Sequence, residues 1–273
     1  MFQANYKVEQ FFRFLLKRSI RIDPAYILAI FLTLGLFKAM SFVPSYRGIK
    51  LPFIPAQFLA HVFYFVPFTK YPFYLHVFWT LCVEFPFYLL VGLGYFLVDN
   101  RIYRSVFLLL FASSCFIPFS NAYYLIFNYA PVFALGISLV DYYKQHHWQN
   151  LILPFICLII MEIKFGIPIF ILILLSSAAI LYFKSIIKPL GFLGNISYSL
   201  YLTHELVAIV VLGLAKKLNI EAKHNQILLL IAEVCFAILF AWVYYMTIEK
   251  PSINLSKKIF YKKGNDAKNS WWN

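Results

Sequence analysis

The sequence predicts an all-α fold, a polytopic membrane helix bundle of about eight transmembrane helices. Hydrophobic residues make up 62% of the chain and charged residues only 13%, well below the charged fraction of about 25% in soluble domains. The charges are also segregated: from Leu151 to Phe183 only Glu162 and Lys164 are charged. A helix needs roughly 20 apolar residues to cross a bilayer, and several stretches approach that length. The lipid bilayer is therefore the first expected partner.

Apolar stretches place these helices near residues 24–43, 75–98, 104–119, 123–140, 150–164, 166–183, 191–215 and 226–248. The segment 53–68 is different, because it is short and Pro52, Pro55 and Pro67 crowd it. Such a segment is typical of a re-entrant or interfacial piece, which we expect in an outer loop. A ninth spanning helix is the alternative.

Basic residues predict the orientation. With eight spans both ends share a side, and taking that side as cytoplasmic puts 16 of the 24 lysines and arginines in inner segments and 7 in outer ones, as the positive-inside rule requires. We expect a basic cytoplasmic segment (1–23), a membrane domain (24–250) and a basic cytoplasmic tail (251–273). The charge forms no folded basic face, so no nucleic-acid partner is expected. The four cysteines lack metal or redox spacing, so no metal is expected.

The stretch "HVFWTLCVEFPFYLL" carries one acid in an apolar helix. Thr80, Glu84 and Tyr88 are spaced i, i+4, i+8 and share one face. An ionised carboxylate in hydrocarbon costs on the order of 3 kcal/mol, so this face should point into the bundle. Pro86 is expected to kink the helix. Glu84 is either a functional acid or a hydrogen-bonded link between helices.

Two further polar stripes follow. In "GNISYSLYLTHELV", Ser197, Tyr201 and His204 share a helix face, but Ser197 and His204 are about 10.5 Å apart along the axis and cannot form a dyad with each other. His204 is either a catalyst or a hydrogen-bond partner of another helix. In "IEKPSI", Pro251 disfavours a helical residue before it, so we expect Glu249 at a helix end near the interface.

Together these stretches resemble the acyltransferase 3 family of integral membrane O-acyltransferases. "RSIRIDPAY" is similar to the family's Arg-x-x-Arg element, and "FWTLCVEFPFYL" to its Trp-Ser-Leu-x-x-Glu element, with Thr80 in place of Ser. "LGNISYSLYLTHELV" is similar to its Ser-Tyr-x-x-Tyr-Leu-x-His element, with Thr203 where Trp is common, and "IEKPSI" to its terminal Glu-Lys-Pro element. The four motifs occur in the family's order between about residues 11 and 255.

The resemblance implies transfer of an acyl group, most often acetyl, from acyl-CoA to a hydroxyl of a surface polysaccharide or glycolipid of the bacterial cell envelope. The enzyme would be a multi-pass protein of the inner or plasma membrane, with acyl-CoA as donor substrate and no other cofactor. The resemblance assigns catalysis to Glu84, His204, Ser197 and Tyr201, and substrate binding to Arg18, Arg21, Trp79, Thr80, Tyr88 and Glu249. The two arginines would hold the CoA phosphates.

One departure concerns the family's first helix, which carries an Arg-x10-His element that this sequence lacks. The Arg-x-x-Arg element normally follows two helices but here begins at Arg18. We therefore expect the first two helices to be absent, through a shortened reading frame or in a remnant of the family. The alternatives are an inactive membrane scaffold of the same fold and a small proton-coupled transporter, although no internal repeat typical of transporters occurs.

Overall fold

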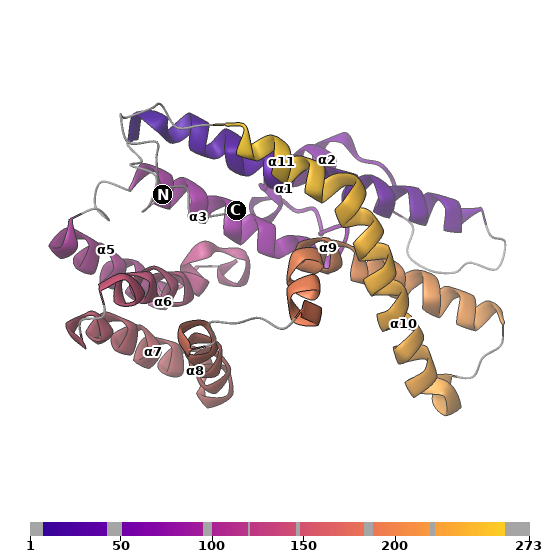
Figure 1. Ribbon diagram of the computed structural model, residues 1–273. Coiled ribbons are helices and arrows are strands. Elements are labelled where there is room, and N and C mark those ends of the chain that lie inside the picture. The colour runs from indigo at the N-terminus through magenta and orange to yellow at the C-terminus, as the bar shows by residue number, and fades with distance from the viewer. Residues whose placement is uncertain are drawn as a thin grey trace. The chain divides into compact units, whose positions relative to one another are not determined.

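The computed structural model describes residues 8–42, 51–94, 100–119, 121–145, 148–182, 188–218 and 222–259. These residues form helices and no strand (Figure 1), which confirms the all-α prediction. The α-helices are α1 (Phe11–Ser41), α2 (Pro55–Val62), α3 (Trp79–Leu93), α5 (Arg101–Ser113), α6 (Ile126–Gln145), α7 (Ile152–Phe165), α8 (Ile167–Tyr182), α9 (Lys188–Lys217), α10 (Ala222–Tyr244) and α11 (Lys250–Lys257). Short 3₁₀ turns include η2 (Val66–Phe68), η3 (His76–Phe78) and η4 (Ser114–Phe116), and a π-helix covers Tyr245–Glu249.

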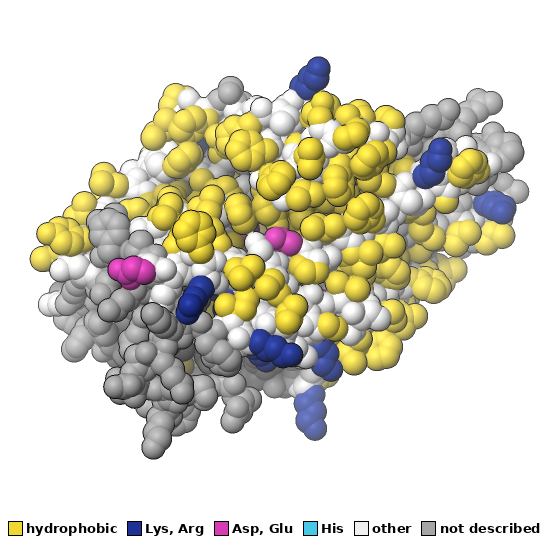
Figure 2. Space-filling view, turned by 90° about the horizontal axis from the view of Figure 1, so that it is seen from above, with side chains coloured by type: hydrophobic (Ala, Val, Ile, Leu, Met, Phe, Trp, Pro, Cys, Tyr) yellow, Lys and Arg dark blue, Asp and Glu magenta, His cyan; other side chains and the backbone are white. Residues whose placement is uncertain are grey.

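Each of the eight expected helices has a counterpart in the structure. Five helical stretches are long and apolar enough to cross a membrane: Phe11–Ser41, His76–Leu93, Ala122–Tyr143, Lys188–Lys217 and Asn225–Lys257. Two shorter apolar stretches are Ile102–Phe116 and Ile167–Tyr182. Hydrophobic side chains cover most of the face seen in Figure 2, with few lysines and arginines among them. The chain is therefore a multi-pass membrane protein.

The predicted boundaries at residues 23 and 250 both fall inside continuous helical stretches. α1 begins at Phe11, thirteen residues before the expected start, and contains Pro24. A proline removes only one helical hydrogen bond, and α1 continues past it because Phe14 and Tyr26, on either side, are both buried. At the other end the chain stays helical to Lys257. Tail residues 260–273 lie outside the described residues.

The chain divides into two compact units, which are described one at a time. Unit 1 comprises residues 1–79 and 188–273, and unit 2 comprises residues 80–187. In unit 1, α9 packs along α10, and α1 packs on α11 and on the π-helix. In unit 2, α5 packs on α6, α6 on α7 and α7 on α8, and α5 also contacts α7. Buried aliphatic and sulfur side chains fill this second core, among them Leu108, Ala134 and Met161.

The segment 51–75 of unit 1 folds back along α1. Phe58 contacts Phe31 with ring centroids 5.4 Å apart, and Tyr64 stacks on Tyr26 at 5.4 Å. α2 has eight residues, or about 12 Å, which is too short for a span. The segment is therefore not a ninth transmembrane helix, as the prolines predicted. Two polar side chains of α2, Gln57 and His61, are buried, whereas the hydrophobic side chains of Phe53, Leu59, Phe63 and Phe65 are exposed.

Candidate functional site

Three of the four motifs meet in unit 1 around the carboxylate of Glu249. One oxygen, Oε2, accepts hydrogen bonds from the Ser199 backbone N–H at 3.1 Å and from the Ser199 hydroxyl at 2.5 Å. The guanidinium of Arg21 is close enough to act electrostatically on the same carboxylate. Glu249 is 4% exposed, and a buried charge needs such partners. The Arg-x-x-Arg, Ser-Tyr and Glu-Lys-Pro elements thus form one polar cluster.

The expectation that a helix ends at Glu249 is wrong. The chain passes from α10 through the π-helix into α11, and Lys250 is helical with φ −61° and ψ −45°. Pro251 would clash with the carbonyl four residues earlier in a regular α-helix. The wider π turn accommodates the missing N–H, and such turns are frequent at functional sites. It also delivers Glu249 to Ser199 in the protein interior rather than to solvent.

His204 has a defined tautomer. Its Nδ1 lies 2.9 Å from the carbonyl oxygen of Tyr201 and 3.1 Å from that of Leu200. Carbonyl oxygens only accept, so in the neutral ring Nδ1 carries the proton and Nε2 holds a lone pair. Nε2 has no hydrogen-bond partner within the described parts of the chain, and the side chain is half-buried. The ring can therefore take up a proton at Nε2, as a general base does.

The turn that begins α3 is attached to α9 beside His204. The Tyr201 hydroxyl donates to the carbonyl of Val77 at 2.7 Å, and the backbone N–H of His76 donates to Oε2 of Glu205 at 3.1 Å. A carboxylate at a helix N-terminus satisfies a free N–H and complements the helix dipole. Tyr201, assigned to catalysis by the resemblance, is thus an anchor whose proton is already donated.

The remaining predicted residues of unit 1 are Ser197, Arg18 and Trp79. Ser197 is exposed and donates to the carbonyl of Gly194 on its own helix at 2.8 Å, so the buried serine of the motif is Ser199. Arg18 is half-buried and stacks over Phe14, with its guanidinium carbon 5.5 Å from the ring centroid. Trp79 is half-buried near His76.

The predicted polar stripe of α3 is present. The Tyr88 hydroxyl donates to Oε1 of Glu84, and Thr80, Glu84 and Tyr88 are all half-buried. This pairing across one helical turn is the one that the i, i+4 spacing predicted. All three residues belong to unit 2, whereas His204 and Ser197 belong to unit 1. Proximity of Glu84 to His204 stays a prediction.

Sequence reasoning missed a further carboxylate of the spanning helices, Asp23 of α1. Its Oδ1 accepts a hydrogen bond from the Tyr64 hydroxyl at 2.7 Å, and Tyr198 donates to the neighbouring Ile22 carbonyl at 3.1 Å. Tyr64 has a positive φ of 60°, and it follows α2 in the position that usually holds glycine. Only the "IDP" acid within an apolar run could have indicated Asp23.

His61, in the segment 51–75, is fully buried and neutral. Nδ1 donates to the Gln57 carbonyl at 2.9 Å, while Nε2 accepts from the Tyr74 backbone N–H at 3.1 Å. The ring stacks on Tyr74 at 4.2 Å. Burial without a charged partner lowers the pKa of His61 to about 4. The residue therefore joins the two ends of the segment and is not a proton donor at neutral pH.

The fold and cluster define a class: an all-helical, multi-pass membrane protein with a polar, partly charged centre inside unit 1. Among the described residues, no group of three or more histidine, cysteine, aspartate or glutamate side chains is placed to hold a metal ion. Comparisons of the chain with known protein families, curated proteins and solved structures find no match. The four motifs and the geometry above thus carry the functional argument.

Proposed function

We propose that this protein is an O-acyltransferase of the bacterial inner or plasma membrane, which moves an acyl group from acyl-CoA to a hydroxyl of an envelope glycan or glycolipid. The observation that carries the proposal is the geometry of His204, whose Nδ1 is bound to backbone carbonyls and whose Nε2 meets no hydrogen-bond partner among the described residues. This histidine is on the same helix as the Ser199–Glu249 contact. Acyl transfer to a hydroxyl needs a base of this kind.

In the proposed reaction, His204 both accepts the proton of the acceptor hydroxyl and returns it to the leaving group. Nε2 removes the proton of the acceptor hydroxyl, and the oxygen attacks the thioester carbonyl. The tetrahedral intermediate then expels the CoA thiolate, which takes the proton from Nε2. The exposed Arg21 and the half-buried Arg18 are the cations for the CoA phosphates. Acetyl is the acyl group that the motif resemblance favours.

Glu249 lies close enough to Arg21 for the carboxylate and the guanidinium to attract each other. The hydrogen bonds between Ser199 and Glu249 hold α9, which carries His204, to the π-helix that follows α10.

The test is transfer of label from acetyl-CoA into the glycan or lipid fraction of membranes that contain the protein. Loss of a general base lowers rates by about 10²–10⁴-fold, so His204→Asn should lose transfer to that extent at unchanged membrane abundance. His76→Asn, an exposed histidine near the same helix, is the matched control and should stay active. Equal transfer in the His204→Asn variant and the parent would remove His204 from the chemistry.

A further inference from the structure

Basic side chains gather at the start of α1 and along α11, both in unit 1. Residues 8–21 and 250–259 contain seven lysines and arginines but a single acid, Glu9. The seven are Arg13, Lys17, Arg18, Arg21, Lys250, Lys257 and Lys258. We call this cluster the basic end. Both of its helices belong to stretches that are long and apolar enough to cross a membrane.

The two parts of the basic end lie at the same face of the membrane, because α1 and α11 run antiparallel. The Tyr244 hydroxyl, just before the π-helix, donates to the carbonyl of Ala25, and Glu249 is close enough to Arg21 to act on it electrostatically. Advancing toward the end of α11 therefore means going back toward the start of α1, and α11 packs along α1 (Figure 1). This register, continued for two turns, brings the end of α11 level with the first turn of α1.

α11 presents its lysines on the face that points away from the protein. Ser252 and Ser256 are 8% and 3% exposed, so they mark the side of α11 that packs on the rest of unit 1. Lys250 and Lys257 are seven residues apart and share a face, which lies about 100° or more around the helix from both serines. Both lysines are exposed, as is Lys258.

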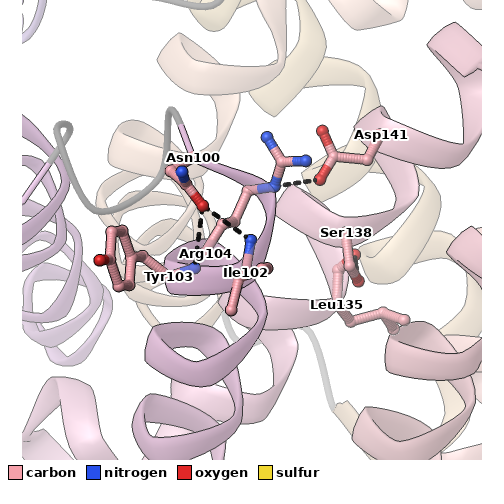
Figure 3. Close-up of polar contacts among 7 residues, drawn as sticks. All are labelled: Asn100, Ile102, Tyr103, Arg104, Leu135, Ser138 and Asp141. Carbon is pink, nitrogen blue, oxygen red and sulfur yellow. Dashed lines mark hydrogen bonds and ion pairs between the residues drawn. The ribbon is translucent and has the colours of Figure 1, made fainter.

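Four exposed cations of the basic end have no acidic partner among the described residues. They are Arg13, Lys250, Lys257 and Lys258. In unit 2, by contrast, Nε of Arg104 lies 2.8 Å from Oδ2 of Asp141 (Figure 3). The polar contact that Lys250 does make is with the sulfur of Met246, at 3.7 Å. The counter-charges of these four cations must therefore come from outside the described residues.

Exposed hydrophobic side chains stand among these cations. Phe12 and Leu16, four residues apart on α1, are 80% and 52% exposed, and Leu255 of α11 is 52% exposed. Beyond the basic end, residues 22–37 and 226–248 carry one acid each and no other charge. Cations and exposed apolar groups side by side at the end of a spanning helix are typical of the head-group region.

We propose that the basic end is a binding site for anionic phospholipids. The four exposed cations hold the phosphate groups, and Phe12, Leu16 and Leu255 lie against the parts of the acyl chains nearest the glycerol. Lipid fits this surface better than a soluble anion does, because the cations are combined with exposed hydrocarbon at the end of two spanning helices. Each cation in such a cluster strengthens attraction to anionic lipid about fivefold. The inference does not depend on acyl transfer.

The test compares phosphatidylglycerol with phosphatidylcholine of the same acyl chains, binding to the full chain in neutral detergent, by native mass spectrometry. We expect phosphatidylglycerol to bind more tightly. Lys257→Gln with Lys258→Gln should weaken its tightest binding about 25-fold, at about fivefold per cation. Lys216→Gln with Lys217→Gln is the matched control and should leave that binding unchanged. This exposed lysine pair lies about 26 Å along α9 from Ser199, and its loss changes the net charge equally.

Two outcomes of this comparison would overturn the proposal. Equal binding of the two lipids by the parent would assign the cations to another anion, such as an acidic protein. Equal losses in the two lysine variants would show that net charge, rather than the basic end, attracts the lipid.

Measurements on the unaltered chain cover the case in which a variant fails to fold. Raising the salt concentration from about 0.05 to about 0.5 M shortens the screening length, so it should reduce the preference for phosphatidylglycerol without changing the binding of phosphatidylcholine. Glycerol phosphate at the same concentration as the lipid should not displace it, because it has no acyl chains to contact Phe12 and Leu16. A preference that ignores salt, or displacement by glycerol phosphate, would also contradict the proposal.

Discussion

The two units of this protein are built on different principles. In unit 1, polar contacts join segments that are far apart in sequence, as in Asp23 with Tyr64 and Ser199 with Glu249. In unit 2, the described long-range polar contacts lie near the helix ends, and Glu84 pairs with Tyr88 on its own helix. This difference is why the proposed chemistry is sought in unit 1, whose described polar contacts join distant helices.

The largest expected effect is that of a substitution at Glu84, because a loss of activity there would give unit 2 a chemical role as well. If Glu84 ionises or orients a histidine during transfer, Glu84→Gln should lower acyl transfer by at least about 100-fold without lowering membrane abundance. The labelled acetyl-CoA assay measures it. Glu162→Gln, an exposed acid of the same unit, is the matched control. An active Glu84→Gln variant would mean that Glu84 has only a structural role, and that the catalytic residues lie in unit 1.

The next effect tests whether unit 1 depends on its buried carboxylate. Glu249→Ala leaves the Ser199 N–H and hydroxyl without their acceptor, which should cost about 4 kcal/mol of unfolding free energy, whereas Glu249→Gln keeps an acceptor and should cost about 1 kcal/mol. Thermal unfolding in detergent measures both. Glu233→Gln, on α10 and without a described partner, should be silent. Similar losses for Ala and Gln would contradict the hydrogen-bond argument.

The pH dependence of stability tests the buried state of His61 in the segment 51–75. Burial lowers the pKa of His61 from 6.5 to about 4, so between these values the unfolded chain binds a proton that the folded chain does not. Stability should therefore fall as pH falls from 6.5 to 4, by up to about 3 kcal/mol, and level off below. His61→Gln should flatten this slope, and His76→Gln should not. An unchanged slope in His61→Gln would assign the titration to another group.

The smallest effect concerns Tyr64. Tyr64→Phe keeps the stack on Tyr26 but removes the hydrogen bond to Asp23, which should cost about 1 kcal/mol in thermal unfolding. Tyr64→Gly relieves the positive φ but removes both contacts, so it should be less stable than Tyr64→Phe. Tyr71→Phe, a half-buried tyrosine of the same segment, is the control. A stabilised glycine variant would mean that conformational strain outweighs the side-chain contacts.

Local features of the sequence predicted local features of the structure. Apolar runs predicted the helices, three prolines predicted the interrupted segment, and the i, i+4 spacing predicted the Glu84–Tyr88 contact. The site depends instead on which faces of distant helices meet. Periodicity singled out Ser197, but the face of α9 that packs toward α10 and the π-helix presents Ser199. Contacts across 41 residues (Asp23–Tyr64) and 129 residues (His76–Glu205) have no periodic signal at all.

The π-helix at Tyr245–Glu249 makes the number of residues in this stretch as important for the fold as their identity. A π turn holds one more residue than the α turn that it replaces. Deleting one residue there would rotate everything on one side by about 100° relative to the other, which would swing Glu249 away from Ser199. It would also bring the ring of Pro251 against the carbonyl four residues earlier. This stretch should thus accept many substitutions at exposed positions such as Met246, yet tolerate neither an insertion nor a deletion.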